Sequence, residues 1–181
     1  GKLEVKGGSL EVNNCTLDGL HSDADAAASD EGAIGLYVSG GNAVLNRTTI
    51  VSFEGGGIKV AGLQDAKLLE VTSSIIRLNG RSSAARIGGI SAIGGTADVT
   101  NTLIEENGYD SPNCDAGRCV QGGGLRVDAS GNAILRAGTL LRQNKAYEGR
   151  SIYVATLASP TLCRGSPFLW SITFLHLLPI L

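Results

Sequence analysis

Short runs of alternating apolar and polar residues recur along the chain, with glycine, asparagine and small polar residues between them. One motif places Ser or Thr before Leu or Ile and closes five residues later on a polar residue. It occurs at residues 16–21, 49–54, 74–79, 102–107 and 139–144, and the last three copies end on Asn. Alternation over so few residues predicts short β-strands rather than helices.

A second motif begins with glycine, usually doubled, and continues into an aliphatic run. Its copies are residues 32–38, 56–60, 88–93 and 123–127, with a weaker one at 149–154. A third alternating run lies between the two motifs, and residues 41–45 and 131–135 are close copies of each other. Each repeat therefore predicts three short strands.

The spacing of the motifs predicts how these strands are connected. From the aliphatic residue after the glycines (Ile34, Ile58, Ile90, Leu125) to the next Ser or Thr the interval is 12 to 16 residues. From Ser or Thr to the next such aliphatic residue it varies from 9 to 23 residues. A coil with two corners of fixed length and one corner that admits loops has this pattern.

Stacking solves the problem that a single coil cannot bury its aliphatic side chains. Coils about 4.8 Å apart pair their backbone groups with the coils above and below. We therefore predict an all-β fold, a right-handed parallel β-helix of about five coils over residues 1–155, as part of a longer helix. Asn79, Asn107 and Asn144 would form a ladder at one corner, because Asn tolerates sharp turns and its amide can bond along the stack.

Two other architectures fit less well. An antiparallel sandwich also has short strands and many glycines, but it would not repeat a Ser/Thr–aliphatic–Asn signature in register. A leucine-rich repeat needs a denser leucine pattern.

The composition limits the classes of partner that the chain is expected to bind. The net charge is −2 over 181 residues and the Lys and Arg residues are scattered, so we expect no binding to nucleic acid. The chain has no Met, and we therefore expect it to be a mature chain or an internal piece of a longer protein.

The alternation of Thr-Leu-Ile-x-x-Asn at 102–107 with Gly-Gly-Gly-Leu at 122–125 resembles the repeats of the pectate-lyase-like superfamily. Within it, the repeats are most similar in style to those of polymorphic outer-membrane and autotransporter passenger proteins. The resemblance spans roughly residues 3–155 and implies an extracellular or cell-surface β-helix. It does not define an activity, because this fold carries lyases, hydrolases, epimerases and adhesins.

The catalytic patterns of those enzymes are not found in the sequence. The lyases of the superfamily combine Ca²⁺-binding carboxylates with a basic residue, and the polygalacturonases combine paired Asp residues with Gly-His-Gly and Arg-Ile-Lys. Here the two histidines are His21 and His176, and Gly57-Ile58-Lys59 resembles the basic motif only superficially. We therefore assign no catalytic residue.

The sequence favours a non-catalytic module for adhesion, for recognition of a polysaccharide or a surface protein, or for structural spacing. The alternative is a polysaccharide lyase or hydrolase whose active site is degenerate here or lies outside this chain.

An acidic segment at 21–31 is the best candidate for a metal site. Asp23, Asp25, Asp30 and Glu31 offer the hard oxygen ligands that Ca²⁺ prefers. The alternative is a solvated acidic loop, and we expect no other cofactor.

The longest insertion, residues 108–119, is the best candidate for ligand binding. Tyr109, Asp110 and Arg118 would contact a glycan or a protein, unless the insertion is simply exposed. Cys114 and Cys119 would form a disulfide in an oxidising compartment, or remain free thiols. We expect this insertion and the acidic segment to leave the stack at the same corner.

Cys15 and two glycosylation sequons fall inside the repeats. Cys15 lies in a predicted strand, where we expect a small buried apolar side chain. The sequons are Asn14-Cys15-Thr16 and Asn46-Arg47-Thr48, and so short a pattern arises easily by chance.

The repeat pattern fades in the last segment, residues 156–181. Residues 167–181 are mostly apolar but too few for a membrane span, which needs about 20 residues. The segment is a cap over the last coil, a cleavable anchor signal or sequence foreign to the fold. We expect membrane association only if it is an anchor.

Overall fold

The structure is a computed structural model that describes residues 3–19, 33–61, 68–81, 85–110, 120–128, 130–155 and 161–164. Every regular element within these ranges is a β-strand. No helix of this described part is long and apolar enough to cross a membrane. The acidic residues Asp23, Asp25, Asp30 and Glu31 and the segment 165–181 lie outside the described ranges.

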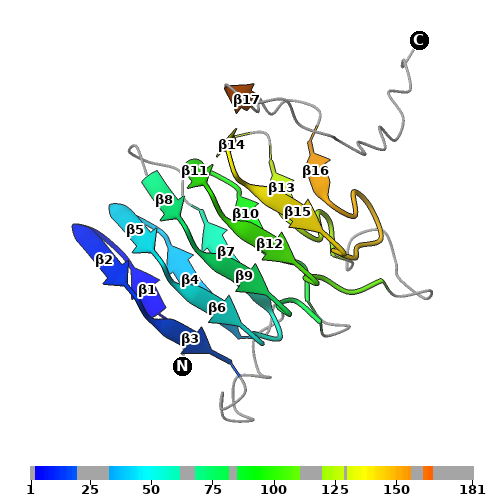
Figure 1. The fold of residues 1–181 in the computed structure, drawn as a ribbon, viewed down its shortest axis with the longest axis horizontal. Helices are drawn as coiled ribbons and strands as arrows, with labels where there is room; N and C mark the ends of the chain where they lie inside the picture. Colours follow the sequence, from blue (N-terminus) through cyan, green and yellow to red (C-terminus); the bar gives the residue numbers. More distant parts are fainter. Residues whose placement is uncertain are drawn as a thin grey trace.

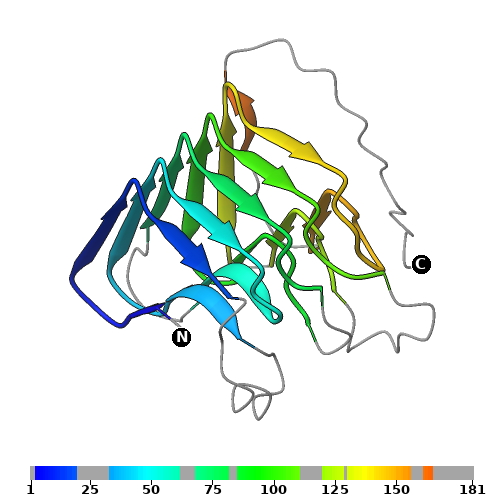
Figure 2. The ribbon, with the colours of Figure 1, turned by 60° about the horizontal axis from the view of Figure 1, so that its bottom comes forward.

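The strands form three sheets in which every neighbouring pair is parallel (Figure 1, Figure 2). The first sheet, A, contains β1 (Leu3–Val5), β4 (Ile34–Val38), β7 (Gly56–Val60), β10 (Ile90–Ala92), β13 (Leu125–Val127) and β16 (Ile152–Val154). The second sheet, B, contains β2 (Ser9–Asn13), β5 (Asn42–Asn46), β8 (Leu68–Thr72), β11 (Thr96–Thr100), β14 (Asn132–Arg136) and β17 (Thr161–Arg164). The third sheet, C, contains β3 (Thr16–Asp18), β6 (Thr49–Val51), β9 (Ile75–Arg77), β12 (Leu103–Glu105) and β15 (Leu140–Arg142).

The chain visits the three sheets in turn, so each coil contributes one strand to each sheet. The described residues give five complete coils and two strands of a sixth. The predicted all-β parallel helix is therefore confirmed. The stack also continues beyond residue 155, where the sequence analysis ended the repeats, because β17 pairs in parallel with β14.

The core is a set of aliphatic ladders inside the coils. In sheet A the residues in register are Leu36, Ile58, Ile90 and Leu125, and in sheet C they are Ile50, Ile76 and Ile104. All seven side chains have an exposed fraction of 0%. Burying one such side chain contributes about 1.5–3 kcal/mol, so each rung of these ladders stabilises the stack.

The three ladder asparagines lie one above another at the corner that leads from sheet C to sheet A. The Nδ2 of Asn79 donates to Oδ1 of Asn107 at 3.0 Å, and the Nδ2 of Asn107 donates to Oδ1 of Asn144 at 3.1 Å. Each Nδ2 also donates to a backbone carbonyl of the preceding coil, that of Ile76 at 2.8 Å in the case of Asn107. The Oδ1 of Asn107 additionally accepts the backbone N–H of Asn79 at 3.1 Å, which completes the four bonds that a primary amide side chain can form.

Two neighbouring features make room for this ladder. The residue before each Asn adopts a left-handed backbone, with φ of 58° at Leu78, 53° at Glu106 and 54° at Gln143. The glycine that leads into the sheet A strand of the same coil lies against the Asn amide: a Cβ on Gly89 would sit 2.6 Å from the Gly124 carbonyl oxygen and 3.1 Å from Nδ2 of Asn107. The paired glycines of the sequence therefore mark close packing against the ladder.

The register of the first two repeats differs from the sequence prediction by one residue. Thr49 pairs with Ile75, and the backbone N–H of Thr48 donates to Oγ of Ser74, so Thr48 rather than Thr49 matches Ser74. Phe53, not Glu54, consequently occupies the ladder position. In the second repeat the cause is that Thr49 precedes Ile50 and satisfies the sequence motif, whereas Thr48 is the residue that matches Ser74.

Two further residues in these repeats also differ from the prediction. Ile34 pairs with Gly56, and Leu36 takes the core position beside Ile58. Cys15 is exposed and lies between β2 and β3, rather than being buried in a strand. Its Sγ donates to the Asn13 carbonyl at 3.1 Å, so in this coil it takes the place of the buried corner hydroxyls of the later coils.

Replacing Asn107 by Ala is expected to lower the free energy of unfolding by about 3 kcal/mol, because it leaves the Ile76 carbonyl and the Asn79 N–H buried without partners. Urea denaturation monitored by circular dichroism measures the change. Asn13→Ala is the matched control, because Asn13 is exposed and, among the described residues, its side chain bonds only the Glu11 carboxylate. Equal shifts for the two variants would contradict the ladder's role.

Gly89→Ala is expected to destabilise the stack strongly, because the new methyl would collide with the backbone of the next coil and with the Asn107 amide. Gly7→Ala is the control, since a Cβ at Gly7 meets nothing within 4 Å. Thermal melts of both variants test this, and a melting temperature of Gly89→Ala close to that of the unaltered protein would refute the packing argument.

Candidate functional site

The loops that can carry a site leave the stack at one corner. Connections from sheet B to sheet C have two or three residues, and those from sheet A to sheet B have three to seven. Connections from sheet C to sheet A have four to nineteen residues. The acidic segment and the cysteine-bearing insertion both belong to this last set, so their shared corner is confirmed, although they emerge about 14 Å apart along the stack.

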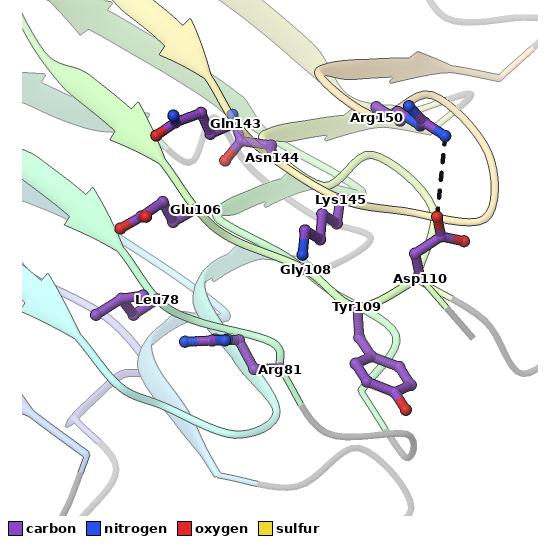
Figure 3. A pocket seen from close by; sticks show the side chains of 10 residues that line it. All are labelled: Leu78, Arg81, Glu106, Gly108, Tyr109, Asp110, Gln143, Asn144, Lys145 and Arg150. Carbon is purple, nitrogen blue, oxygen red and sulfur yellow. Dashed lines mark ion pairs between the residues drawn. The ribbon is translucent and has the colours of Figure 1, made fainter.

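A pocket of about 780 Å³ lies at this corner. Its lining residues lie in the connections that follow β9, β12 and β15, one in each of three successive coils (Figure 3). The lining residues are Leu78, Arg81, Glu106, Gly108, Tyr109, Asp110, Gln143, Asn144, Lys145 and Arg150. The pocket is partly open to solvent, and its charged side chains are exposed.

The asparagine ladder lies at the base of the pocket, where these loops begin. Asn144 itself lines the pocket, and the next residue, Lys145, donates its backbone N–H to the Asn107 carbonyl at 2.7 Å. One coil earlier, Gly108 donates its N–H to the Asn79 carbonyl at the same distance of 2.7 Å. The loop segments entering the pocket are thus fixed at their starting points, although their side chains reach into solvent.

The pocket carries more positive than negative charge. Arg81, Lys145 and Arg150 face Glu106 and Asp110, a local charge of +1 in a chain whose net charge is −2. Arg150 and Asp110 approach to 4.0 Å across one end of the pocket, with side-chain exposures of 78% and 49% (Figure 3). An ion pair this long and this exposed contributes little stability, so both groups remain available to a ligand.

Two other arginines on the described surface are held more firmly. Arg142 donates to Glu105 at 2.8 Å, and Arg136 forms two hydrogen bonds to the Asp98 carboxylate, which raise the pKa of its guanidinium. Within the described residues, the side chains of Arg81 and Lys145 form no ion pair. The pocket therefore gathers two cations without an ion pair and a third, Arg150, whose ion pair is long and exposed.

The cations on the outer face of sheet A differ from those of the pocket, because they contact aromatic rings. Tyr37, Lys59, Ser91, Arg126 and Tyr153 lie there in register on successive strands. The Lys59 ammonium lies 5.7 Å from the Tyr37 ring centre, and the Arg126 guanidinium lies 6.0 Å from that of Tyr153. Arg126 is also bonded to both carboxylate oxygens of Asp128. Lys59 and Arg126 are thus engaged by neighbouring aromatic rings. This face is therefore a weaker candidate for a binding site than the corner pocket.

Two of the three residues predicted to bind a ligand lie in the pocket. Tyr109 has an exposed fraction of 37% at its rim, and Asp110 faces Arg150. Arg118, Cys114 and Cys119 fall outside the described residues, so their roles stay predictions. Within the part of the chain that the structure describes, no group of three His, Cys, Asp or Glu side chains could hold a metal ion.

Sequence reasoning missed the three cations of the pocket. Arg81 lies two coils before Lys145 and Arg150, which share one connection, and only stacking brings Arg81 to them. A usable signal existed, because Arg81 and Tyr109 each come two residues after a ladder Asn, and Lys145 comes one residue after its own. Counting offsets from the ladder would have placed Arg81, Tyr109 and Lys145 at one corner.

Comparison with known proteins returned no match among protein-family models, curated proteins or solved structures.

Proposed function

We propose that this chain is a non-catalytic recognition module of an extracellular or cell-surface β-helix, and that the corner pocket binds an acidic polysaccharide. The observation that carries the proposal is the convergence of Arg81, which follows β9, with Lys145 and Arg150, which follow β15, on one open pocket. Arg and Lys are the side chains that recognise carboxylate groups, Arg through its planar fork and Lys as a point charge.

The remaining lining residues suit the rest of a sugar. Glu106 and the Gln143 amide offer acceptors for hydroxyl groups, and the exposed ring of Tyr109 offers an apolar surface for a sugar face. A pocket open to solvent and lined by several coils accommodates an internal segment of a long polymer. These features support a glycan over a protein partner, which would need a contact surface larger than one pocket.

The alternative function is a polysaccharide lyase or hydrolase. It is favoured by the presence of a lysine and two carboxylates in the same pocket, since lyases need a base and hydrolases need paired carboxyl groups. Incubation with pectin and alginate distinguishes the two: the recognition module binds without releasing unsaturated or reducing ends. Turnover that is lost in Lys145→Ala would establish the enzyme instead.

Lys145→Ala and Arg150→Ala are each expected to weaken binding of an oligouronate about tenfold, the loss of one charge-assisted contact. Isothermal titration calorimetry measures the dissociation constants. Lys6→Ala is the matched control, because Lys6 has a side-chain exposure of 78% and lies in the first coil, away from the pocket. Equal loss in all three variants would indicate nonspecific charge attraction and overturn the assignment.

Asp110→Asn is expected to strengthen binding of the same oligouronate severalfold, because it removes the carboxylate that faces Arg150 and repels an anionic ligand. Raising the salt concentration should reduce this gain, since exposed charges are screened over about 8 Å at physiological ionic strength. Weaker binding in this variant would instead show that Asp110 contacts the sugar directly. A neutral oligosaccharide tested in parallel isolates the charge effect.

A further inference from the structure

The sequence contains two Asn-Gly dipeptides, Asn79-Gly80 and Asn107-Gly108, and both asparagines belong to the ladder. The third ladder residue, Asn144, is followed by Lys145. The chain therefore holds two ladder positions of one chemical type and a third that serves as an internal comparison.

Asparagine followed by glycine is the pair most prone to deamidation in a flexible chain. The backbone nitrogen of the glycine attacks Cγ of the asparagine, because no side chain on the glycine hinders its approach. A new N–Cγ bond closes a succinimide ring, the bond from Cγ to Nδ2 breaks, and ammonia leaves with the proton of the glycine amide. Water then opens the ring to aspartate or isoaspartate, so water is the only co-reactant.

The stack blocks this reaction at the attacking nitrogen. The Gly80 N–H donates to the Phe53 carbonyl at 2.7 Å, and the Gly108 N–H donates to the Asn79 carbonyl at 2.7 Å. Each nucleophile is thus directed into the neighbouring coil, where its proton is held.

The stack also holds the reacting side chain and excludes water. The Asn107 amide is fixed by bonds to the Ile76 carbonyl, the Asn144 Oδ1 and the backbone and side chain of Asn79. Asn79 and Asn107 both have an exposed fraction of 0%, so the water needed for ring opening has no access.

We propose that Asn79 and Asn107 are latent deamidation sites, silent in the folded stack and reactive whenever these coils open. Reaction at either site closes the route back to the native stack. An aspartate at position 107 has no N–H to donate to the Ile76 carbonyl or to Oδ1 of Asn144, and it would bury an unpaired charge. An isoaspartate also lengthens the backbone at a corner where the register is set. Unfolding thereby becomes irreversible with time.

Peptide mass spectrometry tests the proposal on the full chain. The protein is incubated in mildly alkaline buffer, either folded or in concentrated guanidinium chloride, and sampled over days. In denaturant, the peptides containing Asn79 and Asn107 should acquire the mass of the acid while the peptide containing Asn144 remains unchanged. In the folded protein all three should remain amides. Equal conversion in both conditions, or conversion of Asn144 at the same rate, would overturn the proposal.

The glycine is tested separately in denaturant, where folding plays no part. Gly108→Ala should slow conversion of Asn107 by at least tenfold and leave Asn79 unaffected, while Gly80→Ala should do the reverse. No difference between these variants and the unaltered chain would remove the assigned chemistry.

Refolding provides the final readout. The fraction of chains that regain the native melting transition should fall in step with the deamidated fraction as time in denaturant increases. Asn107→Asp, made by substitution, should lower the melting temperature far more than Asn13→Asp, its exposed counterpart. Full refolding of deamidated chains would show that the modification has no structural consequence.

Discussion

The structure depends on a buried primary amide that must satisfy all of its hydrogen bonds across the stack. At Asn107 the two donors and the carbonyl oxygen find partners only in the coils before and after it. An unpaired amide buried there would cost a few kcal/mol, so the requirement fixes the register of neighbouring coils. It also explains the left-handed residue that precedes each ladder Asn and the glycine that packs beside it. One type of side chain thus accounts for both the left-handed corner residues and the glycines that pack against the ladder.

The same ladder determines where the surface can vary. It fixes the chain at the corner from sheet C to sheet A, and the backbone bonds that follow, from Gly108 to Asn79 and from Lys145 to Asn107, repeat from coil to coil. Beyond them the connection is free to lengthen, as the range of four to nineteen residues shows. A rigid stack that carries variable loops at one edge gathers side chains from several coils into one pocket, and such loops are where binding residues concentrate.

The parts of the fold that repeat were predictable from sequence, and the parts that depend on one residue or on stacking were not. Three strands per repeat and the Asn79, Asn107 and Asn144 positions follow from a recurring pattern. The second copy was placed one residue out, because Thr49 satisfies the motif while Thr48 is the residue that matches Ser74. The cations of the pocket escaped because Arg81 lies two coils before Lys145 and Arg150, and a linear pattern does not show that they meet.

The glycine after two of the ladder asparagines links the stability of the fold to its chemical lifetime. Gly108 has φ of 85°, and a Cβ there would collide with the Lys145 carbonyl, so the folded stack requires glycine at that position. In an open chain the same lack of a side chain exposes the backbone nitrogen to Asn107. Gly108, which the folded geometry requires, is therefore also the residue that lets Asn107 react when the stack opens. At Asn144 the next residue is a lysine that lines the pocket, so this rung lacks the glycine that makes Asn79 and Asn107 reactive in an open chain.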